Sequence, residues 1–318
     1  MKIVVLDGHA LNPGDLSWDC LEKFGQITVY DRTPEEKIVE RIGDAQIVLL
    51  NKTPITEATL AACPSVKLIC VLATGYNVVD CDAAKARGIP VCNVPAYGTA
   101  AVAQFTFALL LELCHAVGVH SESVHRGDWC RSTDFCYWKT PQMELYGKTI
   151  GIIGFGRIGR AVGKIANAFG MKVIAYNRSQ CDEGNTIGTY VSLEELLTTA
   201  DIISLHCPLS AENTGMINAV AISKMKDGAI LINTARGPLV DEVALRDALA
   251  CGKLRGAACD VISAEPMKAD NPLKDAPNCI VTPHMAWAPL ESRKRIQDCT
   301  ERSIRAFLDG KPINTVNM

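Results

Sequence analysis

Short runs of consecutive apolar residues recur along the chain, separated by segments with the spacing of amphipathic helices. In the first hundred residues these runs are KIVVLD, ITVYD, QIVLLN, KLICVLA and IPVCNV. Strands without strict alternation of apolar and polar residues are typical of parallel sheets that helices cover on both faces. The pattern therefore predicts a βαβ unit at the start of the chain.

A second series of the same kind begins at KTIGIIGFG and continues with MKVIAY, DIISLHC, AILINTA, RGAACDVI and CIVTPH. Between these runs, SLEELLTTA and DEVALRDALACG have helical spacing. Ser192, three residues before Glu195, predicts a capping box, and Asp241 predicts an N-cap. The fold class is therefore α/β, with two sheet–helix units.

Two segments lie between the series. The apolar stretch 98–118 is interrupted by Gln104, Glu112 and His115, which favours a buried helix over a membrane span. The aromatic and polar segment 125–148 is too irregular for a core element, and we interpret it as a surface excursion at an interface.

Composition excludes several classes of function. The 318 residues carry a net charge of −3, which indicates neither a nucleic-acid nor an anionic-membrane partner. The 14 cysteines show no C-x-x-C spacing and lie mostly in apolar runs, which favours buried thiols in a reducing, cytoplasmic compartment. No metal site is expected.

A glycine motif opens the second series. Gly154, Gly156 and Gly159 form G-x-G-x-x-G directly after a strand and before a helix. In a βαβ setting the first glycine permits a tight turn, the second lets a pyrophosphate approach, and the third packs helix on strand. The alternative is a glycine-rich turn without a ligand, but the setting favours dinucleotide binding.

The next strand ends in an unusual sequence for this motif. An acidic residue often follows there and binds the adenosine ribose of NAD, but this chain has Asn177, Arg178 and Ser179. Asn177 removes the repulsion of a 2′-phosphate, while Arg178 adds a planar cation suited to phosphate. We therefore expect NADP to be favoured over NAD, with use of both retained, unless Arg178 merely points to solvent.

The chain resembles the D-isomer-specific 2-hydroxyacid dehydrogenases over nearly its whole length. The residues that carry the resemblance are LATGYNVVD (72–80), GFGRIG (154–159), LHCPL (205–209), NTARGPLVDE (233–242), DVISAEP (260–266) and TPHMAW (282–287). LDGHALNPGDLSW and VAQFTFALLLEL resemble the glycerate dehydrogenase, or hydroxypyruvate reductase, branch.

The resemblance implies two Rossmann-like doubly wound parallel-sheet domains. The substrate domain would be discontinuous, comprising residues 1–98 and 289–318, and the dinucleotide-binding domain would comprise residues 99–288. The implied activity is NAD(P)-dependent reduction of a short 2-keto acid, hydroxypyruvate or glyoxylate, to D-glycerate or glycolate. The implied assembly is a homodimer through residues 99–150, in which Trp138 contacts substrate in the neighbouring subunit.

The resemblance also assigns the catalytic residues. His284 would be the acid/base, Glu265 would orient its imidazole, and Arg236 would bind the substrate carboxylate. From the residues alone His206, which also ends a strand, competes with His284. The resemblance implies that His284 is the acid/base.

The remaining expected contacts involve substrate and cofactor. The substrate-binding residues would be Ala73, Thr74, Gly75, Arg236 and Trp138. The cofactor-binding residues would be Gly154, Gly156, Arg157, Ile158, Gly159, Asn177, Arg178, Ser179, Cys207, Pro208, Thr234, Ala235, Arg236, Asp260 and His284. Cys207 is therefore a poor candidate for a catalytic thiol.

Other functions remain possible on such a scaffold. A different 2-hydroxyacid, formate or phosphite dehydrogenase shares the small-acid site, and only substrate assays separate these enzymes. A dinucleotide-sensing regulator, as in the co-repressors that resemble these dehydrogenases, predicts nucleotide binding with negligible turnover.

Overall fold

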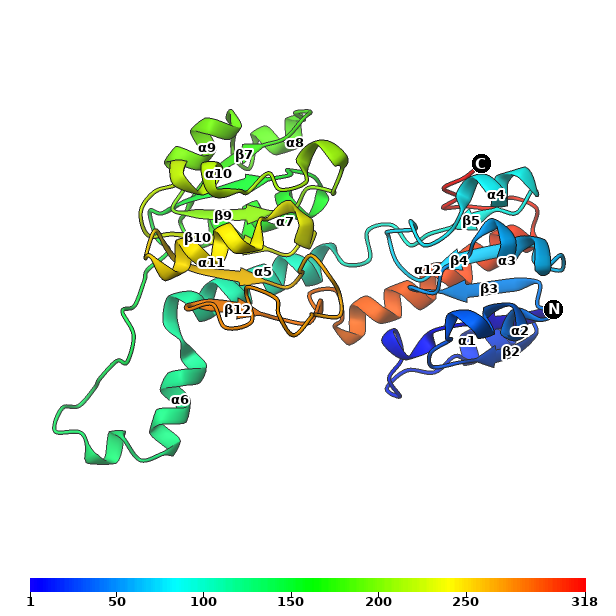
Figure 1. Ribbon diagram of the computed structural model, residues 1–318, viewed down its shortest axis with the longest axis horizontal. Coiled ribbons are helices and arrows are strands. Elements are labelled where there is room, and N and C mark those ends of the chain that lie inside the picture. Colours follow the sequence, from blue (N-terminus) through cyan, green and yellow to red (C-terminus); the bar gives the residue numbers. More distant parts are fainter. The chain divides into compact units, whose positions relative to one another are not determined.

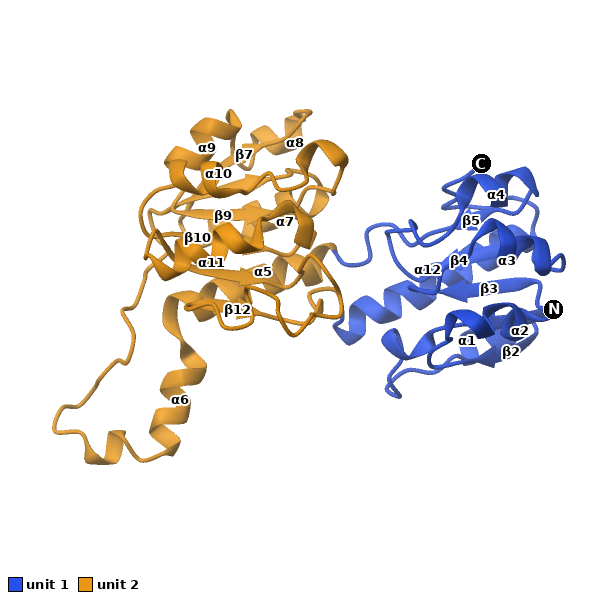
Figure 2. Cartoon of the chain, viewed as in Figure 1, with its two compact units in different colours: residues 1–98, 288–318 blue, residues 99–287 orange.

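All 318 residues are described by the computed structural model, in which the strands form two separate parallel sheets (Figure 1). The chain divides into two units (Figure 2). Unit 1 consists of residues 1–98 and 288–318, and unit 2 consists of residues 99–287. Each unit has its own sheet, and unit 1 is built from both ends of the chain.

The sheet of unit 1 has the order β2-β1-β3-β4-β5, with every pair parallel. Its strands are β1 (Lys2–Val5), β2 (Gln26–Val29), β3 (Ile47–Leu50), β4 (Leu68–Val71) and β5 (Val91–Cys92). The inner strands β3 and β4 are buried along their whole length, because helices cover both faces. The apolar runs of the sequence therefore form the strands predicted from them.

Helices α1 (Asp19–Glu22), α2 (Ile38–Ile42), α3 (Glu57–Ala62), α4 (Cys81–Ala86) and α12 (Leu290–Leu308) surround this sheet. Helix α12 buries Ile296 and Ile304 in unit 1. Arg293 of α12 forms a bidentate ion pair with Asp15, in which Nη1 and Nη2 each donate to one carboxylate oxygen at 2.6 Å. The last helix is thereby attached to the first residues of the chain.

The sheet of unit 2 has the order β12-β11-β10-β9-β6-β7-β8, again parallel throughout. Its strands are β6 (Thr149–Ile153), β7 (Lys172–Tyr176), β8 (Thr189–Tyr190), β9 (Ile202–Leu205), β10 (Ala229–Asn233), β11 (Leu254–Cys259) and β12 (Cys279–Val281). Strands β7 and β8 follow β6 on one side of it, and strands β9 to β12 are then added on its other side. The switch point of this doubly wound sheet therefore lies between β6 and β9, and such sheets bind their ligands at the switch point.

The helices of unit 2 are α5 (Thr99–His115), α6 (Val117–His125), α7 (Arg157–Ala168), α8 (Asp182–Asn185), α9 (Leu193–Thr199), α10 (Ala219–Lys224) and α11 (Glu242–Ala250). Helix α5 packs against α7, and Phe107 stacks on Phe169 with ring centroids 5.2 Å apart. Helices α9, α10 and α11 cover the other face, where their apolar residues join one core cluster.

The helix predicted over 98–118 differs from the structure at its end. Helix α5 stops at His115 because Ala116 adopts a left-handed conformation, with φ 43° and ψ 50°. The chain then turns by 57° into α6. Helix α6 and the segment after it, residues 117–140, stand away from the sheet of unit 2 and are called the projecting arm (Figure 1).

No helix of the chain is by itself long and apolar enough to cross a membrane. The bent pair α5 and α6 reaches that length and composition only when both are taken together. Within this pair, α5 buries residues such as Phe107, Leu109 and Leu110 in the core of unit 2.

The predicted helix starts are largely as expected. The Asp241 carboxylate accepts the N–H groups of Val243 and Ala244, which confirms the N-cap of α11. Ser192 accepts the N–H of Glu195 at 3.1 Å, which confirms the cap of α9. The structure shows no return bond from the Glu195 side chain, so the predicted capping box is present only in half.

Candidate active site

The loops that carry most of the predicted site residues lie at one edge of unit 2. Strands β6, β7, β9, β10, β11 and β12 are parallel, so their carboxyl ends share this edge. The loops after them contain the glycine motif, the 177–179 segment, Cys207, Arg236, Glu265 and His284. This edge is where sheets of this type bind ligands.

The glycine motif forms a tight turn between β6 and α7. Gly154 has φ +94°, and a Cβ there would lie 2.3 Å from the backbone nitrogen of Cys207. A Cβ on Gly159 would lie 2.2 Å from the Gly154 carbonyl oxygen. Both positions therefore require glycine, because the turn packs directly on the loop after β9 and on its own helix.

The space next to this turn suits a dinucleotide. Apart from Gly156 itself and its two chain neighbours, no residue lies within 4 Å of the place that a Cβ of Gly156 would occupy. Helix α7 begins at Arg157 without a side-chain cap, so N–H donors of its first turn are available to an anion. A pyrophosphate fits this cradle, with Arg157, Ile158 and Gly159 supplying the first turn.

The 177–179 segment is held by the Asn177 side chain. Its Oδ1 accepts the N–H of Phe155 at 3.1 Å, and its Nδ2 donates to the Ser179 carbonyl at 2.6 Å. An aspartate could accept the first bond but could not donate the second. Asn177 thus links the glycine turn to the segment that presents Arg178 and Ser179, which are exposed.

Other predicted cofactor residues follow β9 and β10. Cys207 is half-buried, and burial raises the pKa of its thiol, which supports the view that it is not a nucleophile. Pro208 next to it is exposed. Thr234 is buried, and its hydroxyl contacts that of Thr106 at 3.1 Å. Ala235 is buried beside it.

His284 and Glu265 are brought together from two neighbouring loops. The Nδ1 of His284 lies 2.7 Å from Oε2 of Glu265, and both side chains are about one-third exposed. The other carboxylate oxygen, Oε1, accepts the N–H of Ile262 at 3.3 Å. The carboxylate thus fixes the ring orientation and leaves the distant nitrogen, Nε2, for a reacting group.

Asp260 shapes the loop that carries His284. Its buried carboxylate accepts the hydroxyl of Thr282 at 2.6 Å and the N–H groups of Met285 at 2.9 Å and Ala286 at 2.8 Å. Within this clamp His284 has φ +52°, a left-handed conformation that non-glycine residues rarely adopt. Such backbone strain is typical of functional positions that the surrounding structure holds in place.

Arg236 lies in the adjacent loop after β10. Its carbonyl accepts a hydrogen bond from Asn233 at 2.9 Å, and its exposed guanidinium donates to the Ala235 carbonyl at 2.6 Å. The next residue, Gly237, touches the loop after β11, because a Cβ there would lie 1.9 Å from the carbonyl carbon of Ile262. The Arg236 loop and the Glu265 loop therefore pack as one body.

His206 has a different environment from His284. Its Nε2 lies 2.8 Å from the Ser204 hydroxyl, and its Nδ1 is buried without a partner. Burial lowers the pKa of His206 to about 3. Its imidazole is therefore neutral near pH 7, and it is not a proton donor there.

Comparison with known proteins agrees with this geometry. Residues 107–286 match the family described as D-isomer specific 2-hydroxyacid dehydrogenase, NAD binding domain. The chain belongs to this dehydrogenase family. The predictions of an NAD(P)-dependent oxidoreductase and of the family are thereby confirmed.

Individual relatives extend the similarity to the whole chain. A hydroxypyruvate reductase of Blautia hydrogenotrophica is 54% identical, with 100% of both chains covered. A glycerate dehydrogenase of Methylorubrum extorquens is 46% identical, covering 99% of this chain and 98% of that protein. The solved structure of a D-lactate dehydrogenase from Aquifex aeolicus, complexed with NAD and lactic acid, is 32% identical. Its TM-score is 0.83, and 100% and 99% of the two chains are covered. The predicted two-sheet fold is confirmed.

In this dehydrogenase, the predicted substrate loop of unit 1 follows β4. Its shape is fixed by residues after β5, since Thr74 donates its hydroxyl to Val94 O at 2.8 Å and Asn93 donates to Thr74 O at 2.7 Å. No hydrogen bond within the chain engages the N–H groups of Thr74 and Gly75. These donors are available to an anion at the carboxyl edge of the unit 1 sheet.

Trp138 lies in the segment after α6 and is 68% exposed. It borders a hollow of about 500 Å³ together with residues of α6, among them Val117, His120 and Val124. Two contacts attach the segment that carries Trp138 to α6. The Tyr137 hydroxyl contacts that of Ser123 at 2.6 Å, and the Lys139 N–H donates to Nε2 of His120. The structure thus places Trp138 in the projecting arm of unit 2.

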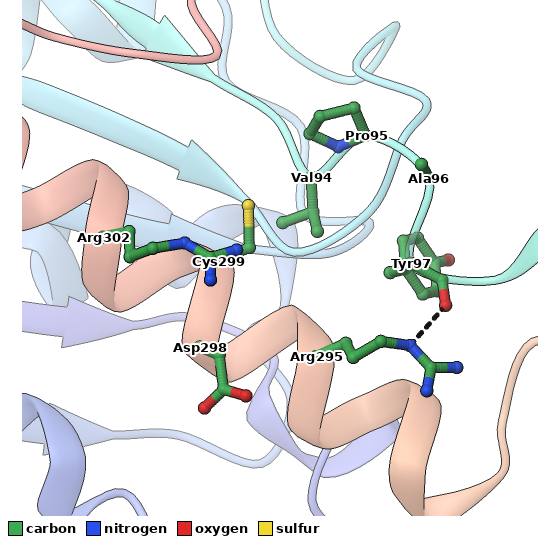
Figure 3. Close-up of a pocket in the computed structure, with 8 residues that line it drawn as sticks. All are labelled: Val94, Pro95, Ala96, Tyr97, Arg295, Asp298, Cys299 and Arg302. Atoms are coloured by element: carbon green, nitrogen blue, oxygen red, sulfur yellow. Dashed lines mark hydrogen bonds between the residues drawn. The ribbon is translucent and has the colours of Figure 1, made fainter.

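A smaller hollow of about 230 Å³ lies in unit 1 between α12 and the segment Val94–Tyr97 (Figure 3). Arg295 donates to the Tyr97 carbonyl across it at 2.9 Å, and Arg302 and Cys299 face it from the same helix (Figure 3). None of the predicted catalytic residues of the dehydrogenase lines this hollow.

The sequence did not indicate the contacts through which two residues organise the site. Gly237 brings the Arg236 and Glu265 loops into contact, and Glu242 binds the loop that carries Glu265. Both lie in the motif NTARGPLVDE. The motif marks them, but their partners lie beyond β11 and are not apparent without the fold.

Proposed function

We propose that this chain reduces hydroxypyruvate to D-glycerate, and glyoxylate to glycolate. The observation that carries the proposal is the hydrogen-bonded pair of Glu265 and His284 beside the Arg236 loop, at the ligand-binding edge of an NAD(P)-binding unit. The names of two relatives, a hydroxypyruvate reductase and a glycerate dehydrogenase, support this choice of substrate.

The chain's residues have separate tasks in this reaction. A bound NAD(P)H supplies the hydride that reaches C2 of the keto acid. His284 donates a proton from Nε2 to the oxygen at C2 as the alkoxide develops, and Glu265 holds the ring in place through its hydrogen bond with Nδ1. In the reverse direction the neutral imidazole accepts the same proton.

The substrate carboxylate requires cationic or N–H partners. We propose Arg236 for this role, because a guanidinium binds a carboxylate through two parallel hydrogen bonds. The N–H groups of Thr74 and Gly75, with Ala73 beside them, provide further donors. Binding of the carboxylate orients C2 and its oxygen for hydride and proton transfer.

The preference for NADPH over NADH is also proposed. Arg178 is exposed, and its charge acts on Glu212 and Cys207 without a salt bridge or hydrogen bond to either. Asn177 places no negative charge near a 2′-phosphate, while Ser179 adds a hydroxyl donor. Use of NADH is retained, since the pyrophosphate cradle serves both dinucleotides.

We propose that the projecting arm forms a homodimer interface within residues 99–150. The arm exposes several large apolar side chains, namely Val117, Val119, Val124, Trp129, Phe135 and Trp138. Three of them, Val117, Val124 and Trp138, line one hollow, and apolar side chains gathered in this way are typical of protein–protein interfaces. Trp138 would contact substrate in the neighbouring subunit.

Replacement of the acid/base tests the proposed reaction. His284→Gln should lower kcat for hydroxypyruvate reduction by about 10²–10⁴-fold, since general acid catalysis contributes on this order. NADPH affinity, measured by fluorescence titration, should change little. The measurement is steady-state reduction of hydroxypyruvate, glyoxylate and pyruvate with each dinucleotide.

The control is Glu194→Gln on α9, an exposed carboxylate outside both the proposed site and the proposed dimer interface, which should retain full activity. Near-normal turnover in His284→Gln would contradict the role of His284. Absence of hydroxypyruvate and glyoxylate reduction in the unmodified enzyme would contradict the proposed substrates.

A further inference from the structure

The Glu242 side chain makes an unusual set of contacts for the first residue of a helix. Its Oε1 accepts the N–H of Ser263 at 2.6 Å, and its Oε2 accepts the Ser263 hydroxyl at 2.8 Å. Oε2 also accepts a hydrogen bond from Nδ2 of Asn271 at 2.9 Å. No Lys or Arg pairs with this half-buried carboxylate, so its charge is stabilised by these three donors.

The two partners of Glu242 bracket Glu265. Ser263 precedes it by two residues, and Asn271 follows it by six. The segment between them has no helix or strand and is largely exposed. Its shape therefore depends on anchors at its ends rather than on a regular backbone ladder.

A continuous series of contacts runs from α11 to the imidazole. Glu242 binds Ser263, the adjacent Ile262 donates its N–H to Glu265 at 3.3 Å, and Glu265 binds His284 Nδ1 at 2.7 Å. On its other side Ile262 packs against Gly237, in the loop that carries Arg236. Movement of the 263–271 segment would thus displace Glu265 relative to His284.

Resting on the reaction proposed above, we propose that Glu242 is a positioning residue for the acid/base. It holds the 263–271 segment so that Glu265 stays within hydrogen-bonding distance of His284, and it thereby keeps the imidazole ring oriented for proton transfer from Nε2. Glu242 touches neither substrate nor dinucleotide in this role.

The rate per active site separates positioning from a purely structural role. Misorientation of the His284 ring slows the chemical step, so kcat falls while the KM for NADPH stays nearly unchanged. A variant that merely lowers stability reduces the amount of active enzyme and leaves kcat per NADPH-binding site unchanged.

The test compares variants by steady-state hydroxypyruvate reduction, with each rate divided by the concentration of NADPH-binding sites from fluorescence titration. Glu242→Ala should lower this kcat by about tenfold, because misplacement of a supporting group by a fraction of an ångström costs on this order. The KM for NADPH should be nearly unchanged. Glu242→Gln retains an acceptor for the Ser263 N–H and should restore most of the rate.

Two further variants complete the test. Ser263→Ala removes only the hydroxyl bond to Oε2, so it should lower kcat by a smaller factor, even where Glu242→Ala fails to fold. Glu194→Ala on α9 removes an exposed carboxylate paired with Lys224 at 2.9 Å, and its kcat should match that of the unmodified enzyme.

An unchanged kcat per NADPH-binding site in both Glu242→Ala and Ser263→Ala would overturn the positioning role while leaving the proposed reaction intact. Failure of the unmodified enzyme to reduce either keto acid would instead overturn the proposed reaction. The two outcomes are distinguished by the same assay.

Discussion

At the scale of single residues, His206 and His284 illustrate how surroundings decide what an imidazole does. Both follow strands at the same edge of unit 2, yet only His284 has a carboxylate partner. Burial lowers the pKa of His206 to about 3, compared with about 6.5 for an unfolded chain. As the pH falls below about 6.5, the unfolded chain therefore binds a proton that the folded chain excludes.

It follows that His206 adds stability that is fully present above about pH 6.5 and is lost as the pH falls towards 3. His206→Gln removes this titration and keeps a partner for Ser204. Between pH 7 and 4.5, the unmodified enzyme should lose about 2 kcal/mol more unfolding free energy than the variant. Urea denaturation at both pH values measures the difference, and equal losses would contradict the prediction.

Arg178 is the residue on which the proposed coenzyme preference depends. Arg178→Ala should lower kcat/KM for NADPH by about tenfold, or roughly 1.4 kcal/mol, which is within the range for one exposed charge-assisted contact. The value for NADH should change by much less, because the ribose hydroxyl does not require the cation. Kinetics with both dinucleotides test this, with Arg302→Ala as a control for an exposed arginine elsewhere.

Asn177 has a second role in the proposed coenzyme site. Its amide both accepts from Phe155 and donates to Ser179, so it has a structural role in addition to the absence of charge. The sequence indicated that an acidic residue is missing here. It did not indicate that an amide is needed to shape the segment that presents Arg178.

At the scale of elements, the strands were predictable because their apolar runs are buried on both faces of parallel sheets. The end of α5 was not, since alanine at 116 is a good helix former and nothing local indicates its left-handed conformation. The pairing of Glu265 with His284 depends on β11 and β12 being neighbours. Their roles were therefore expected from the family resemblance, whereas Glu242, whose partners lie 21 and 29 residues away, was not found.

The cap of α11 connects stability with catalysis. Asp241 caps the helix whose first residue is Glu242, so Asp241→Ala should lower the unfolding free energy by about 1 kcal/mol and also reduce kcat. Ser192→Ala removes the cap of α9, which carries no proposed site residue. It should cost a similar unfolding free energy and leave kcat unchanged. Urea denaturation and steady-state kinetics on both variants check this, and equal kinetic effects would contradict it.

At the scale of the whole molecule, the projecting arm is expected to determine assembly. Phe135 is 88% exposed, and with Trp138 it would lose contact with water in the proposed dimer. Phe135→Ser combined with Trp138→Ser should weaken the dimer by at least tenfold, measured by sedimentation velocity over a concentration series. Val220→Ser removes an exposed apolar residue of α10, outside the arm, and should leave the assembly unchanged.

Unit 1 is interrupted in sequence by the whole of unit 2, which has a consequence for synthesis. The five strands of its sheet are complete by residue 92, whereas α12 begins only at Leu290. At about 5–20 residues per second, a ribosome needs roughly 10–40 seconds to reach that helix. During this interval the surface that will receive Ile296 and Ile304 has no cover. We therefore expect the nascent first unit to expose apolar surface, of the kind that chaperones bind, until α12 emerges.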